Sequence, residues 1–168
     1  GCIVDNVDTI VAVNRAVREG KPLITRIVTV TGDAVMDPQN FQVRIGTNYH
    51  ELIDEAGGFV AEPARIVSGG PMMGFGIFDL DVPTTKTASA LLCLSKDEVG
   101  QPSACINCGR CVEACPSRLV PTLLEKYARH YDTEAFVKRD GMECCECGCC
   151  SYVCPAKRQL TQAIKSMR

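Results

Sequence analysis

The sequence contains no tryptophan, and aromatic residues make up only 5% of its 168 residues. Histidine is scarce as well, since only His50 and His130 occur and neither stands in a recognisable motif. A nucleophilic cysteine usually needs a base such as histidine to activate it. No pattern in the sequence points to such a pair, and we expect no catalytic residue of this kind.

An excess of charge of one sign is also missing. Eighteen Lys and Arg residues stand against twenty Asp and Glu residues, which gives a formal net charge of −2. Proteins that bind nucleic acid usually carry a clear basic excess. We therefore expect no nucleic-acid partner.

Long apolar runs and leader segments are absent too. The longest apolar run, Ala88–Leu94, is interrupted by Ser89 and is far shorter than the about 20 residues that a membrane helix needs. The chain begins at Gly1, without a starting Met, and continues into charged sequence without a secretory leader. We expect a soluble, cytosolic chain that has no transmembrane segment and is part of a longer protein.

Cysteine, in contrast, is abundant. Twelve cysteines occur in 168 residues, of which only Cys2 and Cys93 lie in the first hundred. The other ten fall between Cys105 and Cys154. A disulfide scaffold is typical of short secreted chains that follow a signal peptide. Because no such segment is present, the thiols are expected to serve another purpose.

The residues before the cysteine-rich part alternate between helical and strand periodicity. Apolar positions from Val7 to Val17 predict a helix, with Asp5 or Asn6 as its N-cap and Gly20 and Pro22 after its end. Strands are expected at 24–31, 41–45, 65–68 and 90–94, and a short helix at 48–56. A hairpin, a helix and a returning strand form a small α+β unit of the β-grasp kind.

The polar segment from Ser95 to Pro102 contains Gly and Pro near its end and is typical of a linker. We expect three parts: residues 1–22 as an N-terminal helix, residues 23–95 as the β-grasp domain, and residues 96–168 as a helical, cysteine-rich domain.

The cysteine-rich part contains one motif twice. The spacing C-x2-C-x2-C-x3-C-P is typical of bacterial ferredoxins that hold two [4Fe–4S] clusters. Three cysteines of each run wrap one cluster, while the fourth lies on a helical turn that faces the other cluster. With this crossover, we expect one cluster on Cys105, Cys108, Cys111 and Cys154, and the other on Cys144, Cys147, Cys150 and Cys115.

Two other uses of these cysteines fit the spacing poorly. Structural zinc prefers two C-x2-C pairs separated by a longer loop. Disulfides would be strained between such close cysteines. Cys145 and Cys149 exceed the ligand count and are expected to be spare thiols beside a cluster, with alternative ligands or redox sensors as the other interpretations. Cys2 and Cys93 are expected to be small buried hydrophobic residues.

The segment between the two runs predicts helices. Leu119 to Ala128 follows helical spacing with Pro121 in the first turn, and Thr133–Lys138 forms a second short helix. The tail Leu160–Arg168 is also expected to be helical. The four cations from Lys157 to Arg168 stand without an acid and would offset cluster charge, meet an acidic partner, or simply form a solvated face.

Glycines around 69–76 invite comparison with a phosphate-binding loop. They match neither G-x-G-x-x-G nor G-x4-G-K-[ST]. A turn that allows a close backbone approach is therefore the better interpretation.

Taken together, the chain resembles the C subunit of the Rnf electron transport complex. The resemblance extends over essentially the whole sequence, and the eight cysteines match the family's ligand pattern position by position. The segments that carry it are 4–9, 20–24, 28–32, 45–47, Gly69-Gly70-Pro71-Met72-Met73-Gly74 and Cys147-Gly148-Cys149-Cys150-Ser151-Tyr152-Val153-Cys154-Pro155.

This resemblance implies an electron relay through two [4Fe–4S] clusters, within an oxidoreductase that moves electrons between ferredoxin and NAD and couples them to ion translocation. It implies a domain of the soluble-ligand-binding β-grasp kind, and an upstream domain that binds FMN and NAD(H). It further implies other membrane and iron–sulfur subunits as partners, ferredoxin as an indirect partner, and a peripheral position on the cytoplasmic side of the cell membrane.

Two further hypotheses stay open at this point. A cobalamin reductase of the propanediol-utilisation type looks similar and shares the order of β-grasp and clusters, although the residues from Cys150 to Pro155 favour the Rnf family. Alternatively, the chain is an interaction module in which the clusters only hold a small domain together.

Overall fold

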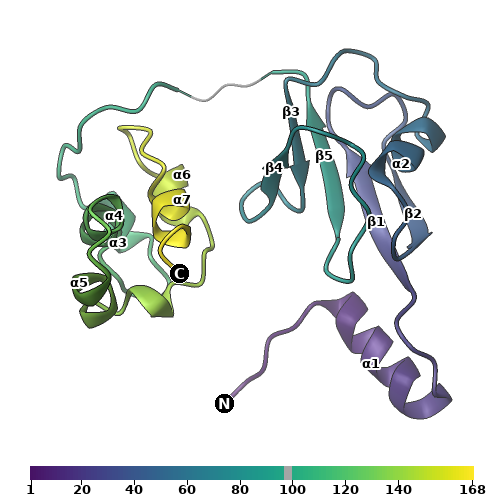
Figure 1. Ribbon diagram of the computed structural model, residues 1–168, viewed down its shortest axis with the longest axis horizontal. Helices are drawn as coiled ribbons and strands as arrows, with labels where there is room; N and C mark the ends of the chain where they lie inside the picture. Colours follow the sequence, from purple (N-terminus) through teal and green to yellow (C-terminus); the bar gives the residue numbers. More distant parts are fainter. Residues whose placement is uncertain (97–99) are drawn as a thin grey trace. The chain divides into compact units, whose positions relative to one another are not determined.

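The computed structural model describes residues 1–96 and 100–168, which form two compact units. The first unit contains a five-stranded mixed sheet and two helices, and the regular elements of the second are helices (Figure 1). The predicted α+β class is therefore confirmed. Residues 97–99 of the expected linker lie outside the described residues, and the division at residues 22 and 95 stays a prediction.

Helix α1 (Val7–Glu19) is the predicted N-terminal helix. Asn6 caps it by accepting a hydrogen bond from the Asp8 amide at 2.9 Å, and Gly20 ends it with a left-handed φ of +64°. None of its residues is buried, so its apolar positions stay exposed. Asp8 forms an ion pair at 3.1 Å with Arg26, whose side chain is buried at the start of the sheet.

The sheet has the strand order β2-β1-β5-β3-β4. Strands β1 (Thr25–Thr31) and β2 (Gln39–Arg44) form an antiparallel hairpin, and β5 (Ala90–Leu94) lies parallel to β1. On its other side β5 pairs antiparallel with β3 (Arg65–Ser68). The edge strand β4 (Phe75–Ile77) has only three residues, and the sequence pattern missed it.

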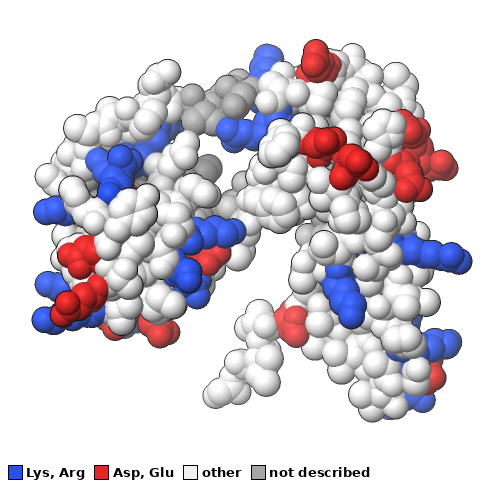
Figure 2. Space-filling view, in the orientation of Figure 1, with Lys and Arg blue, Asp and Glu red and all other residues white. Residues whose placement is uncertain are grey.

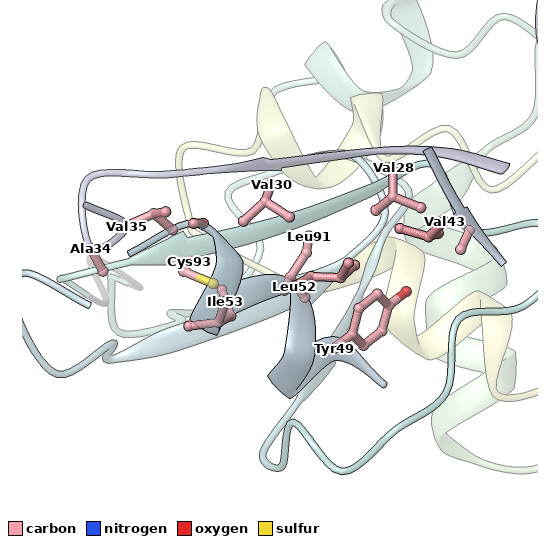
Figure 3. Packing of buried hydrophobic residues seen from close by; sticks show 12 residues of the cluster. Val28, Val30, Ala34, Val35, Val43, Tyr49, Leu52, Ile53, Leu91 and Cys93 are labelled. Atoms are coloured by element: carbon pink, nitrogen blue, oxygen red, sulfur yellow. The ribbon is translucent and has the colours of Figure 1, made fainter. Parts of the chain in front are cut away.

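Helix α2 (Tyr49–Glu55) covers one face of the sheet (Figure 1). Asn48 and Glu51 form a reciprocal capping box at its start, which satisfies two amides that the helix leaves free. Between the helix and the sheet lies the core, in which each fully buried aliphatic side chain contributes about 1.5–3 kcal/mol. The core side chains labelled in Figure 3 are Val28, Val30, Ala34, Val35, Val43, Tyr49, Leu52, Ile53, Leu91 and Cys93.

The second unit consists of short helices. They are α3 (Arg110–Glu113), α4 (Pro121–Arg129), α5 (Thr133–Lys138), the 3-10 turn η1 (Gly141–Glu143), α6 (Cys149–Tyr152) and α7 (Leu160–Lys165). The helices α4, α5 and α7 were predicted, including Pro121 in the first turn. Helix α4 packs against both α5 and α7. Leu119, Leu124, Phe136 and Ile164 fill the space between them.

Candidate metal centres

Two cavities in the second unit are lined by the predicted cluster ligands. The first has a volume of about 130 Å³ and is lined by Cys105, Cys108 and Cys111, together with Cys154 of the other cysteine run. Cys111 lies in α3, and Cys154 follows α6. The structure thus brings the four cysteines of the first predicted set to one cavity.

The second cavity shows the reverse combination. It measures about 20 Å³ and is lined by Cys144, Cys147 and Cys150, together with Cys115 of the first run. Cys145 borders the same cavity. Every cysteine of the predicted crossed sets therefore lies at the cavity to which the spacing assigned it, and their role as ligands stays a prediction.

The two cysteine runs also fold alike. Cys144 lies 39 positions after Cys105, and the same offset relates α3 to α6 and the first residue of α4 to that of α7. A non-glycine residue rarely adopts positive φ, so matched positive values reflect a common constraint of the loop. They occur at Asn107 (54°) and Glu146 (55°), at Gly109 (77°) and Gly148 (80°), and at Arg118 (55°) and Lys157 (52°).

Backbone amides point toward some of the sulfur atoms. The amide of Asn107 donates to Sγ of Cys105 at 3.4 Å, and the amide of Leu119 donates to Sγ of Cys115 at 3.3 Å. Hydrogen bonds to the charged form of a group favour that form. These amides therefore stabilise thiolates, which are the ligand form of cysteine.

Crowding and burial act in the opposite sense when no cation is present. Burial raises the pKa of the Cys111 thiol, and the neighbouring Cys150 and Cys154 raise it further. The pKa of the Cys144 thiol is raised mainly by burial as well, with Cys150 contributing. Thiols packed this closely are costly to ionise unless a cationic iron–sulfur core compensates their charge.

The donor set fits an iron–sulfur cluster. A cubane cluster is held by four thiolates that each bind a different iron. Two separate cavities, each bordered by four motif cysteines, meet that requirement.

The four remaining cysteines lie in different environments. All twelve cysteines are described and none forms a disulfide. Cys93 is buried in the sheet core as predicted, and burial raises the pKa of its thiol to about 11. Cys2 is exposed, so the prediction of a buried hydrophobic residue is wrong there, because the whole segment before α1 lies at the surface. Cys145 is exposed and Cys149, the first residue of α6, is half-buried.

The basic tail is largely neutralised within its own unit. Arg168 donates to Glu146 at 2.6 Å, and Lys165 lies 3.5 Å from the same carboxylate. Arg158 pairs with Glu125. The tail is therefore not a free cationic surface, and Figure 2 shows basic and acidic side chains interspersed on the face of this unit that is in view.

Sequence reasoning missed Glu125 completely. Its side chain is only 2% exposed, and its carboxylate pairs with both Arg129 and Arg158. The position looks like an ordinary polar residue of an amphipathic helix. What distinguishes Glu125 is its contact with Arg158, which lies 33 positions later in the sequence and is brought close only by folding.

The glycine-rich loop after β3 makes the close backbone approach that was expected. A Cβ at Gly69, whose φ is +106°, would lie 2.9 Å from Cα of Gly74. Met72, Met73 and Phe75 of this segment are exposed.

Comparisons with known proteins match one family model to each of the two units. An SLBB domain model matches residues 27–76, and a 4Fe-4S dicluster domain model matches residues 104–157. The C subunit of the proton-translocating ferredoxin:NAD(+) oxidoreductase complex of Clostridium ljungdahlii is 49% identical over 74% of this chain and 28% of its own length. The Na(+)-translocating counterpart of Acetobacterium woodii is 42% identical over 98% of this chain and 38% of its own length.

The predicted resemblance to the C subunit of these complexes is confirmed. The corresponding C subunit of an ion-translocating oxidoreductase complex of Yersinia pestis is also similar, with 43% identity over 80% of this chain and 22% of that protein. The chain thus spans between about a fifth and two fifths of the length of these relatives. No helix in the described part of the chain is long and apolar enough to cross a membrane.

Proposed function

We propose that this chain is the electron-relay part of a complex that transfers electrons between ferredoxin and NAD and couples this transfer to ion translocation. The observation that carries the proposal is the crossed arrangement of motif cysteines around two cavities. The match of residues 104–157 to a 4Fe-4S dicluster domain supports it. The names of the similar subunits supply the reaction.

In this proposal, Cys105, Cys108, Cys111 and Cys154 hold the first cluster, and Cys144, Cys147, Cys150 and Cys115 hold the second. Each bound [4Fe–4S] cluster supplies reversible one-electron chemistry. The chain itself contributes ligation, hydrogen bonds and the exclusion of water, and no acid–base residue is assigned.

Apolar side chains keep water away from the sites. Leu160 is fully buried, packs with Cys111 and Cys150 and borders the first cavity. Leu124 and Ile164 are also buried and border the second. Because both cavities lie in one small unit, clusters held there would exchange electrons within that unit. Burial and hydrogen bonds to sulfur then set the two potentials.

The sheet unit is proposed to be a β-grasp, supported by its mixed sheet and by the SLBB match. In this view residues 1–22, 23–95 and 96–168 are separate parts. FMN and NAD(H) would bind in the part of the relatives' length that this sequence does not cover. The partners would be the membrane and iron–sulfur subunits of an Rnf-type complex, with ferredoxin an indirect partner, on the cytoplasmic face of the membrane.

Anaerobic reconstitution of the purified chain with iron and sulfide tests the relay. We expect about eight iron atoms per chain and broad absorbance near 400 nm. A redox titration should then show both clusters reduced reversibly at low potential. A chain that binds no iron, or whose clusters cannot be reduced reversibly, would contradict the proposal.

A second experiment addresses the partners. A tagged chain expressed as part of its full-length protein in native membranes should co-purify with membrane subunits and with ferredoxin-dependent NAD reduction. A corrinoid-dependent activity without membrane subunits would instead support the cobalamin reductase hypothesis.

A further inference from the structure

The two cavities are built from equivalent positions of the internal repeat. The second run contributes several residues to the first cavity. The residue 39 positions before each of them lines the second cavity. Cys154 thus corresponds to Cys115, and Thr161 of the second cavity corresponds to Thr122 of the first. A difference between corresponding side chains is therefore a difference between the two cluster sites.

The largest such difference is a charge. Arg158 borders the first cavity, and its counterpart at the second cavity is Leu119. Arg158 is 18% exposed, and Leu119 is buried. A cation that is mostly removed from water acts on its neighbours more strongly than a solvated one, because the surrounding dielectric screens it less.

Arg158 is held in place by its contact with α4. Its Nη2 donates to Oε2 of Glu125 at 2.5 Å, and Glu125 is itself fixed by a second pairing with Arg129. The Nε atom of Arg158 is buried and has no hydrogen-bond partner among the described residues. A buried donor without a partner is costly, which suggests that a ligand accepts from it.

A second difference is an acid at the other site. Asn107 borders the first cavity, and its counterpart Glu146 borders the second. Glu146 is paired with Arg168 and Lys165, both of which remain partly exposed. These contacts neutralise Glu146, and neither of its two cations lines the second cavity. The difference in charge between the two sites therefore rests on Arg158.

We propose that Arg158, positioned by Glu125, donates its Nε–H to a sulfur atom of the cluster at Cys105, Cys108, Cys111 and Cys154, and so makes this cluster easier to reduce than the other. This inference rests on the proposed function, because it requires both clusters to be bound. Reduction adds one negative charge to a cluster, and a buried cation beside it stabilises that charge. An electron that enters at the second cluster then moves downhill to the first.

The test is a redox titration, followed by electron paramagnetic resonance, of the anaerobically reconstituted chain and its variants. Wild type should show two reduction steps. In Arg158→Leu, which copies the residue of the second site, the step at the higher potential should fall by about 59 mV, a tenfold change in its reduction equilibrium. The step at the lower potential should stay unchanged.

Two further variants serve as controls, one for the buried Glu125 carboxylate and one for the loss of a nearby exposed charge. Because Arg158→Leu leaves Glu125 buried with fewer partners, we add Glu125→Gln/Arg158→Leu, which removes both charges and should be the more stable fold. Without the remaining Glu125 anion, this variant should shift the same step in the same direction but by a smaller amount. Lys157→Asn removes a charge at the exposed neighbouring position, and Asn tolerates the left-handed φ of 52° found there. This control should leave both steps near their wild-type potentials.

The outcomes separate the two proposals. A wild-type chain that assembles no clusters would contradict the proposed function. The role of Arg158 would be overturned if both clusters assemble but neither reduction potential changes in the two Arg158 variants. It would also be overturned if the potentials of both clusters change by the same amount. Neither result would contradict the proposed electron relay. A shift in Lys157→Asn as large as that in Arg158→Leu would also overturn it, because burial would then be irrelevant.

Discussion

Gly32 lies against the backbone of Cys93, where the turn after β1 meets β5. A Cβ added to Gly32 would overlap the carbonyl oxygen of Cys93 and lie 2.6 Å from its carbonyl carbon. Gly32 also has a φ of +123°, which L-residues rarely adopt. The amide of Ala34 donates to the same carbonyl at 3.3 Å, so the turn is tied to β5 at this point.

Gly32→Ala is therefore expected to destabilise the sheet unit strongly. Backbone strain costs about 1–3 kcal/mol, and the overlap with main-chain atoms adds a similar amount. The matched control is Gly46→Ala, which has a φ of +98° but open space around the new Cβ. Urea denaturation of both full-length variants, followed by circular dichroism, measures the difference. Equal losses in the two variants would show that the contact with Cys93 is unimportant.

The buried thiol of Cys93 should make the stability of the sheet unit depend on pH. Burial raises the pKa of its thiol from 9.0 to about 11, so the folded chain keeps a proton that the unfolded chain loses between these values. The folded state binds more protons there, and stability falls as pH rises through this window. Across this window, the free energy of unfolding of the wild type should fall by on the order of 2 kcal/mol relative to that of Cys93→Val. Urea titrations of both proteins at pH 8, 9, 10 and 11 measure this difference, and a constant difference would refute the prediction.

The crossed ligand sets predict which cysteine substitutions act on the same cluster. Cys115→Ala and Cys147→Ala should each damage the second cluster, so the double variant should lose no more than one cluster. Cys108→Ala combined with Cys115→Ala should damage both clusters, although these two cysteines belong to the same run. Mössbauer spectra of reconstituted variants count the intact [4Fe–4S] clusters. The reverse pattern would mean that each run holds its own cluster.

Controls for that experiment come from the cysteines that exceed the ligand count. Cys145→Ala and Cys149→Ala should both retain two intact clusters. Cys145 is the stricter control, since it borders the second cavity while its side chain is exposed.

Phe136 and Gly141 are predicted to be energetically coupled. Phe136 is fully buried, and a Cβ at Gly141 would lie 2.6 Å from Cζ of its ring. Gly141→Ala should therefore cost about 1–3 kcal/mol through overpacking. In a Phe136→Leu background the smaller side chain makes room, so the added cost should be lower. The effect of each substitution is measured as the change in the temperature at which the reconstituted variant loses its cluster absorbance. If the changes caused by Gly141→Ala and Phe136→Leu simply add in the double variant, the coupling is contradicted.

Local patterns predicted most elements because their causes are local. The caps Asn6 and Asn48 and the position of Pro121 act within one helical turn, and all three mark the helix starts found in the structure. Strand β4 escaped prediction because three residues with a central Gly76 carry too little alternation. It is a strand only because β3 offers it a partner.

The spacing within the two cysteine runs was enough to predict which cysteines lie at each cavity. Such spacing is effective because ligands two or three residues apart are held by one short loop whose backbone has few options. The exposure of Cys2 and the contact between Glu125 and Arg158 became visible only in the folded chain. That contact joins residues 33 positions apart, and no local sequence pattern marks such a pair. The difference between the two cavities therefore appears only after α4 and α7 have packed together.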